Sequence, residues 1–182
     1  MEACDKALWK GVWGLQSPKK VKNLLWRACR NAIPTKENLV HRTVLEDPVC
    51  DQCNGALESP LHALWSCFEL DVVWIDPILW SFNRTHMFMD FKELLSWVIY
   101  QDKDLELFAM IAWSIWTQQN QVHLAQLNVN LHLLAQVSKD RHEEFMALQV
   151  PHSLPQQADP CFVATSPLDM LQNKFQWSYF CC

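Results

Sequence analysis

The chain has 182 residues, half of them apolar and 19% charged, which is enough apolar surface to form a core and excludes wholesale disorder. Its three glycines argue against a turn-rich β-sandwich or barrel, and its longest apolar run, residues 107–116, has about half the length of a membrane-spanning helix. The formal net charge of −5 divides into +6 over residues 1–45 and −11 over residues 46–182, so a phosphate-binding surface is expected in the first quarter of the chain.

The predicted elements are mostly helices, and the first helix follows residues 9–15. This stretch, WKGVWGL, is expected to be extended or irregular, with its two tryptophans in the core. Ser17 and Pro18 are typical of an N-cap and a first helical turn, which predicts a helix to about Asn31, and a second short helix is expected over residues 35–42. The predicted buried face of the first helix consists of Val21, Leu24, Leu25 and Ala28.

A loop and a third helix are predicted in the middle of the chain. Residues 44–57 show no hydrophobic period, and Gly55 lies where a turn would need a positive φ. Ser59 and Pro60 repeat the cap-and-proline pattern, which predicts a helix that extends toward Trp74.

Three longer helices and a tail are predicted in the rest of the chain. Asp90 is expected to cap the first of these three helices, which begins at residue 91. Apolar periodicity predicts the other two over residues 105–127 and 131–148. Residues 151–182 are rich in Pro, Gln and Ser and show no period, so we expect a poorly ordered tail.

Three of the eight cysteines lie within eighteen residues, and a histidine lies among them. The spacing C-x2-C-x8-H-x4-C joins Cys50, Cys53, His62 and Cys67, and three thiolates with one imidazole are the usual donor set of a closed tetrahedral zinc site. His62 and Cys67 can approach one ion only if their helix ends or distorts near Cys67. Because four protein ligands leave no open position, we expect one structural Zn²⁺.

Two alternatives compete with zinc. The CxxC pair can arise by chance, with the histidine on the face of an amphipathic helix, or it can be a redox pair, which expects a βαβ context that residues 40–60 lack. The opening MEACDKALWK has no apolar stretch typical of a secretory signal, so we expect an intracellular protein, nuclear or cytoplasmic, with reduced cysteines.

Basic residues concentrate in the predicted helices of the first quarter. They form a candidate footprint for the phosphates of RNA or DNA, and the alternative is the solvated face of an amphipathic helix. Trp26 lies among them and is expected to pack in the core, the alternative being a platform for an unpaired base. The candidate residues are Lys19, Lys20, Lys22, Arg27, Arg30 and Lys36.

These motifs resemble the zinc-binding domain that follows the reverse transcriptase in polyproteins of plant LINE-type retrotransposons. The resemblance covers roughly residues 9–80, with the matching segments WKGVWGL, SPKKVKNLLWRACRNAIPTKENLVHR, CDQC and ESPLHALWSC, and Trp74. It implies a small helical domain with a zinc-knuckle loop. The ligands that it implies are Cys50, Cys53, His62 and Cys67.

A looser resemblance continues beyond residue 80. AWSIWTQQNQ is similar to a Trp-rich helix that follows this domain in the family, and Gln119 and Asn120 stand where an Arg-Asn pair is usual. PLDMLQNKFQWSYF is similar to the lead-in to a ribonuclease H domain, but Gln176 follows Phe175 where the family has a catalytic Asp. No P-loop, GxSxG, HExxH or GxGxxG motif occurs, so we expect no enzymatic activity.

The sequence therefore predicts a mostly α protein in three parts. These are a zinc-binding domain over residues 1–80, a helical extension over 81–150 and a low-order tail over 151–182 that resembles a degenerate lead-in to ribonuclease H. The expected function is a non-catalytic, retrotransposon-derived module with accessory nucleic-acid binding, weak and independent of sequence. The alternative is a zinc-stapled scaffold that docks on neighbouring polyprotein domains without nucleic-acid binding. No membrane partner is expected.

Overall fold

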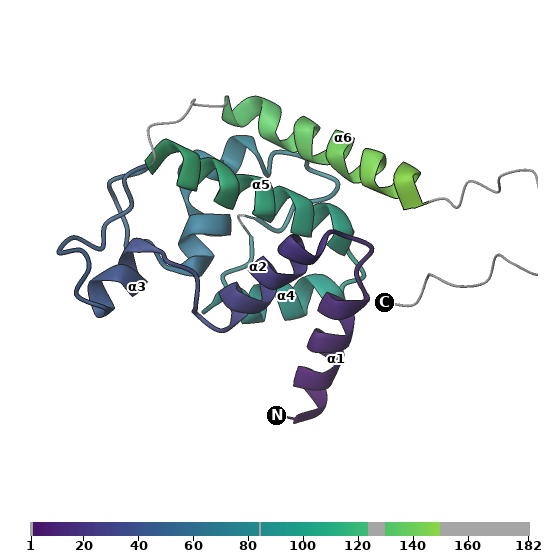
Figure 1. Ribbon diagram of the computed structural model, residues 1–182, viewed down its shortest axis with the longest axis horizontal. Coiled ribbons are helices and arrows are strands. Elements are labelled where there is room, and N and C mark those ends of the chain that lie inside the picture. Colours follow the sequence, from purple (N-terminus) through teal and green to yellow (C-terminus); the bar gives the residue numbers. More distant parts are fainter. Residues whose placement is uncertain (1, 84, 124–129, 150–182) are drawn as a thin grey trace, which may run out of the picture. The chain divides into compact units, whose positions relative to one another are not determined.

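The computed structural model describes residues 2–83, 85–123 and 130–149, which are mostly helical (Figure 1). Within these ranges the β-structure is one isolated bridge, between Val49 and Leu57, which confirms the mostly α fold class. The elements are α1 (Glu2–Gly14), α2 (Lys19–Cys29), α3 (Lys36–His41), the π-helical turn η1 (His62–Ser66), the 3₁₀ turn η2 (Phe68–Val72), α4 (Phe91–Tyr100), α5 (Leu105–His123) and α6 (Leu131–Gln149).

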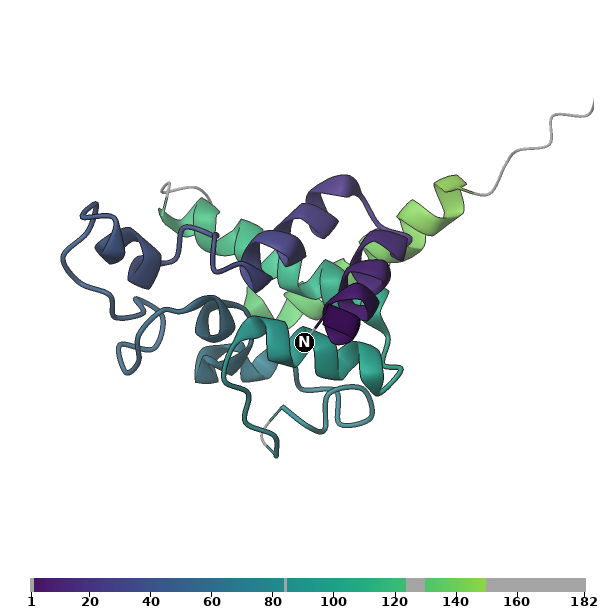
Figure 2. The ribbon, with the colours of Figure 1, turned by 90° about the horizontal axis from the view of Figure 1, so that it is seen from below.

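The first half of α5 is the centre of the core. Its residues 107–112 are all buried, because the helix is apolar on most of its faces there and is covered from several directions. The helices α2 and α6 and the turn η1 pack against it, and α1 and α2 also contact α4 (Figures 1 and 2). None of the described helices has the length and apolar character needed to span a bilayer.

An aromatic cluster joins η1 to α5. Trp65 of η1 lies 4.7 Å from Trp74 and 5.1 Å from Phe82 between ring centroids, and Trp74 lies 5.3 Å from Phe108 of α5. All four rings are buried, and offset or tilted pairs of this kind are stabilising beyond the apolar area that they bury. The cluster therefore fixes η1, and with it His62, against the central helix.

The N-terminal segment differs from the expectation, because residues 9–14 belong to α1 and are neither extended nor irregular. Leu8, Val12 and Leu15 recur at helical spacing and are buried, whereas Trp13 is 49% exposed. A Cβ atom at Gly11 would lie 2.9 Å from Cδ1 of Ile99 in α4. A glycine at this position thus permits the close approach of α1 and α4.

The predicted start of α2 is correct in place but wrong in mechanism. Pro18 occupies the N-cap position with no side-chain cap hydrogen bond, and the Ser17 hydroxyl is buried with no partner among the described residues. Thr35 does hold the N-cap position of α3, also without a side-chain cap hydrogen bond. The expected buried face of α2 is confirmed and consists of Val21, Leu24, Leu25 and Ala28.

The later helices agree with their predicted positions. Oδ1 of Asp90 accepts a hydrogen bond from the Glu93 backbone amide at 2.8 Å and caps α4 as expected. The helix α6 packs on α5, where the hydroxyl of Ser138 donates to that of Ser114 at 2.9 Å in the interior. The expected continuation of α5 to residue 127 and the tail over 151–182 lie outside the described residues.

The described residues between 2 and 149 belong to one compact unit. Within this unit, helices before and after residue 80 share a core, since α1 and α2 pack against α4 and α5. The division of the chain at residue 80 stays a prediction.

Candidate metal centre

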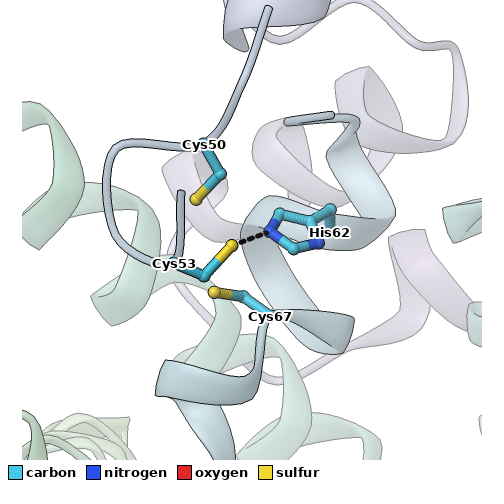
Figure 3. A group of neighbouring side chains, drawn as sticks. All are labelled: Cys50, Cys53, His62 and Cys67. Carbon is cyan, nitrogen blue, oxygen red and sulfur yellow. Dashed lines mark hydrogen bonds between the residues drawn. The ribbon is translucent and has the colours of Figure 1, made fainter. Parts of the chain in front are cut away.

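The four residues with metal-ligand spacing lie together (Figure 3). One ligand atom from each lies within 4.8 Å of the others, and Sγ of Cys53 is 3.3 Å from Nε2 of His62. Cys50, His62 and Cys67 are buried, and Cys53 is half-buried. The cluster joins three segments: the loop before η1, η1 itself, and the residue that follows it.

Backbone hydrogen bonds shape the loop that carries the two cysteines of CDQC. The amide of Cys50 donates to the Ala56 carbonyl, and the amide of Asn54 donates to the Cys50 carbonyl, both at 2.9 Å. The residue with a positive φ in this turn is Asn54, at 50°, and not Gly55 as expected. Asparagine tolerates this conformation better than most residues, so the turn closes one position earlier than the glycine indicates.

The turn η1 brings His62 and Cys67 to the same side. In a regular α-helix a residue five positions on is rotated by about 140° around the axis, which would point the two side chains apart. Here the amide of Cys67 donates to the His62 carbonyl at 3.2 Å in a wide π-helical turn, and Cys67 itself is extended, with φ −64° and ψ 130°. The predicted distortion near Cys67 is confirmed, whereas the predicted continuous helix toward Trp74 is wrong.

The start of η1 follows the expected cap. The Ser59 hydroxyl accepts a hydrogen bond from the backbone amide of His62 at 3.2 Å, and Pro60 occupies the first turn. This cap sets the direction in which His62 leaves the loop.

Burial keeps two of the thiols and the imidazole in their neutral forms. Burial raises the pKa of Cys50, raises the pKa of Cys67 to about 12, and lowers the pKa of His62. Burial also acts to raise the pKa of Cys53, but hydrogen bonds from the Gly55 amide and the neighbouring thiols outweigh it, so that this pKa is lowered. Cys53 is thus the thiol that ionises most readily.

The donor set and its spacing fit a tetrahedral ion. A metal–sulfur distance of about 2.3 Å and a metal–nitrogen distance of about 2.0 Å place neighbouring donors roughly 3.5–3.8 Å apart, which the 4.8 Å cluster accommodates. Three sulfurs and one imidazole nitrogen favour a borderline-soft ion over a hard one such as Mg²⁺. The four residues therefore form a possible metal site consistent with zinc.

Gln119 supports the site from α5, and the sequence pattern did not reveal this role. Its Nε2 donates to the carbonyl of Ala63, in η1, at 2.8 Å in the interior. In the sequence this glutamine was noted only as part of AWSIWTQQNQ, and that segment does not predict a hydrogen bond to a residue 56 positions earlier.

Lys36 ties α3 to the cysteine loop. Its Nζ lies 2.7 Å from Asp51 and 3.9 Å from Asp47, and the hydrogen bond to Asp51 raises the pKa of Lys36. Its backbone amide donates to the buried Glu58 carboxylate at 3.1 Å. The ammonium group of Lys36 is therefore already ion-paired within the chain, next to the cysteine loop.

The other five basic candidates lie on α2 or at its C-cap and keep their charges near the surface. Lys22 donates to the Trp13 carbonyl at 3.1 Å, Arg27 donates to the Ala32 carbonyl at 3.0 Å, and Nζ of Lys20 lies 4.1 Å from the centroid of the Trp113 ring. These contacts orient the cations without neutralising them. Lys19 and Arg30 are exposed.

Trp26 corrects a further expectation. It is 39% exposed and lies on the outer side of α2, so the prediction that it packs in the core is wrong. The apolar pattern of α2 is already complete in its four buried residues, which leaves no inward position for the indole.

Comparisons with known proteins agree with this site. Residues 2–74 match a family model described as zinc-binding in reverse transcriptase, which supports the resemblance seen in the sequence. The chain is 28% identical over 114 residues to an Arabidopsis thaliana protein named "Putative ribonuclease H protein". That similarity covers 58% of this chain and 18% of the relative, so the chain corresponds to a small part of the relative's length. No solved structure matches the chain.

Proposed function

We propose that this chain is a non-catalytic zinc-binding module, derived from a retrotransposon of the LINE type, that binds nucleic acid. The observation that supports the metal is the convergence of four ligand atoms from Cys50, Cys53, His62 and Cys67 within 4.8 Å. A bound Zn²⁺ supplies no chemistry to a substrate at such a site, because four protein ligands leave it no open position. Its contribution is to stability.

The ligands would hold the cysteine loop to the rest of the fold. Cys50 and Cys53 lie on a loop with one isolated bridge and few buried apolar side chains, whereas His62 and Cys67 lie beside the aromatic cluster. One ion across the two pairs anchors the loop to the core, and its binding free energy becomes folding free energy.

Nucleic-acid binding is assigned to the basic face of α2, which consists of Lys19, Lys20, Lys22, Arg27 and Arg30. The sequence has no Asp or Glu from residue 6 to residue 36, so this face carries positive charge without an acidic neighbour along the chain. Lys36 has a smaller part, since it is ion-paired with Asp51. Phosphate contacts alone give weak binding of RNA or DNA that is independent of sequence.

A second function has its own supporting observation. The loop around the metal cluster exposes Val44, Leu45 and Leu57, at 63%, 39% and 54%. Exposed apolar side chains that gather on one loop favour docking on another protein surface. In this alternative the metal shapes a scaffold for neighbouring polyprotein domains, and nucleic-acid binding is lost.

Zinc content tests the metal. Elemental analysis of freshly reduced protein should find one zinc per chain in wild type and almost none in Cys53→Ser. Cys29→Ser is the matched control, because Cys29 is outside the cluster and burial raises its pKa to about 12, so that it stays a neutral thiol. No zinc in the wild type, or full retention in Cys53→Ser, contradicts the zinc site.

Salt dependence tests the basic face. If about four cations neutralise phosphates of a single strand, the slope of log K against log salt should be about −3, since each contact contributes roughly −0.7. Reversal of Lys19, Lys20 and Lys22 to Glu should flatten this slope and leave the zinc in place. The control reverses Lys6, Lys10 and Lys103, which changes the net charge equally. Equal effects of both triple variants, or binding insensitive to salt, favour the docking scaffold.

A further inference from the structure

The outer side of α2 carries one aromatic ring in a row of polar and cationic side chains. Lys19, Asn23, Trp26 and Arg30 follow one another at spacings of four, three and four residues, which places them on one stripe of the helix. All four are exposed, and the stripe lies opposite the buried face of α2. It spans about 16 Å along the helix axis.

A second exposed indole, that of Trp13 at the end of α1, lies near the outer side of α2. Nζ of Lys22 donates to the backbone carbonyl of Trp13, so the end of α1 adjoins the part of α2 that carries Lys22. Lys22 and Trp26 are one helical turn apart, and Trp13 is 49% exposed and Trp26 39% exposed. The positive surface of the chain thus holds two accessible aromatic rings.

Cations and exposed rings together bind a different ligand from cations alone. Phosphates are common to duplex and single strand, and a purely basic face distinguishes them poorly. An indole face stacks on a base that has lost its neighbours, which a single strand offers and an intact duplex does not. Stacking also tolerates any base, because every base has a π-face.

We infer that Trp26 is a base-stacking platform and that it makes the basic face of α2 selective for unpaired RNA or DNA over duplex. This inference rests on the nucleic-acid binding proposed above and adds the class of nucleic acid and the residue that selects it. Lys19 and Arg30, at the two ends of the stripe, contact the phosphates on either side of the stacked base.

The test measures fluorescence anisotropy of labelled oligo(dT), oligo(rU) and a duplex of the same length with the full, zinc-loaded chain. Trp26→Ala should weaken binding of both single strands by about 5- to 150-fold and change duplex binding less than about twofold. Trp26→Phe should retain most of the affinity, because it keeps an aromatic face. Tyr100→Ala is the matched control, since Tyr100 is 84% exposed at the end of α4.

Two results would contradict the stacking platform. The first is that Trp26→Ala weakens binding of neither single strand, and the second is that it weakens duplex binding equally. Sensitivity of binding to the Lys19, Lys20 and Lys22 reversals would still support the proposed nucleic-acid binding. If wild-type protein binds none of the three probes at low salt, both the inference and the nucleic-acid part of the proposed function fail. Unchanged helical circular dichroism in Trp26→Ala shows that a loss of binding is not caused by unfolding.

We expect oligo(dT) and oligo(rU) to bind equally, because an indole stacks on the base and does not contact the 2′-hydroxyl. A preference for one of them identifies the strand chemistry.

Discussion

Gln119 shows how one side chain positions the metal cluster from a distance. Its amide donates to the carbonyl of Ala63, the residue after the candidate ligand His62, and both partners are buried. The hydrogen bond joins the central helix to the turn that carries the ligand. A buried polar pair of this kind is costly to break on one side only, because the remaining partner loses its solvation without compensation.

Gln119→Ala is therefore expected to destabilise the fold by about 1–3 kcal/mol, the cost of a buried acceptor without a donor. Thermal unfolding should show a midpoint lower by several degrees. Gln136→Ala is the control, since Gln136 is exposed on α6 and should change the midpoint little. Equal midpoints for the two variants would show that the Ala63 hydrogen bond contributes nothing.

Proton release is the expected signature of zinc binding at this site. Burial raises the pKa of Cys50 and of Cys67, so both are neutral thiols at pH 7 before a metal binds, whereas the lowered pKa of His62 leaves its imidazole neutral and ready to coordinate. Each thiol must lose its proton to become a ligand. Zinc affinity should therefore fall as the pH falls.

Calorimetry in buffers of different ionisation enthalpy measures this release. About two or three protons should leave per zinc at pH 7, the count depending on how far the lowered pKa of Cys53 has already ionised that thiol. Release of no protons would mean that the thiols do not coordinate the ion.

At the scale of elements, two helix starts that look alike in sequence differ in the structure. Asp90 accepts from the Glu93 amide at 2.8 Å, and the Glu93 carboxylate accepts from the amide of Met89, the residue before the N-cap, at 2.6 Å. This pair is similar to a capping box, with the second hydrogen bond made one residue earlier. The sequence likewise predicts Ser17 as the cap of α2, but Pro18 occupies the N-cap position, and the Ser17 hydroxyl is buried with no hydrogen-bond partner within the described part of the chain. A cap is made by geometry, and the residue type alone does not ensure it.

Asp90→Ala should accordingly destabilise the protein by about 1 kcal/mol, whereas Ser17→Ala should be neutral or slightly stabilising, because it removes an unpaired buried hydroxyl. Urea unfolding of both variants measures the difference. A larger loss for Ser17→Ala than for Asp90→Ala would contradict the two cap assignments.

At the scale of the whole molecule, the apolar core and the metal cluster stabilise different regions. The aromatic cluster and the buried faces of α1, α2, α4 and α5 consist mostly of apolar side chains other than cysteine, although Cys50 and Cys67 also pack in this core. The loop over residues 44–57, by contrast, has little apolar burial of its own. Metal removal should therefore act locally, since regions with few buried contacts open first.

Chelation of zinc is expected to leave most of the helical circular dichroism intact and to raise hydrogen exchange over residues 44–57. The exchange of α5 should change little, since its first half is buried among several elements. Collapse of the helical signal on chelation would show instead that zinc is required for the global fold.

The features predicted correctly from the sequence depend on residues near one another in the chain. The four side chains that lie together, Cys50, Cys53, His62 and Cys67, fall within eighteen positions. The Asp90 cap acts three residues on, and the buried face of α2 repeats within one helix. Local spacing determines these features, because a knuckle, a cap and an amphipathic stripe each need only neighbouring residues.

Tertiary packing decided what the local pattern left open. Residues 9–14 are helical because Gly11 lets α1 approach Ile99 of α4, and Trp26 is exposed because four other residues of α2 fill the contacts with the core. Gln119 donates to a carbonyl 56 residues away, in a turn that Trp65 packs against Phe108 of α5. Each of these outcomes depends on which surfaces of distant elements meet, and the free energy of that contact is not encoded in any short stretch of sequence.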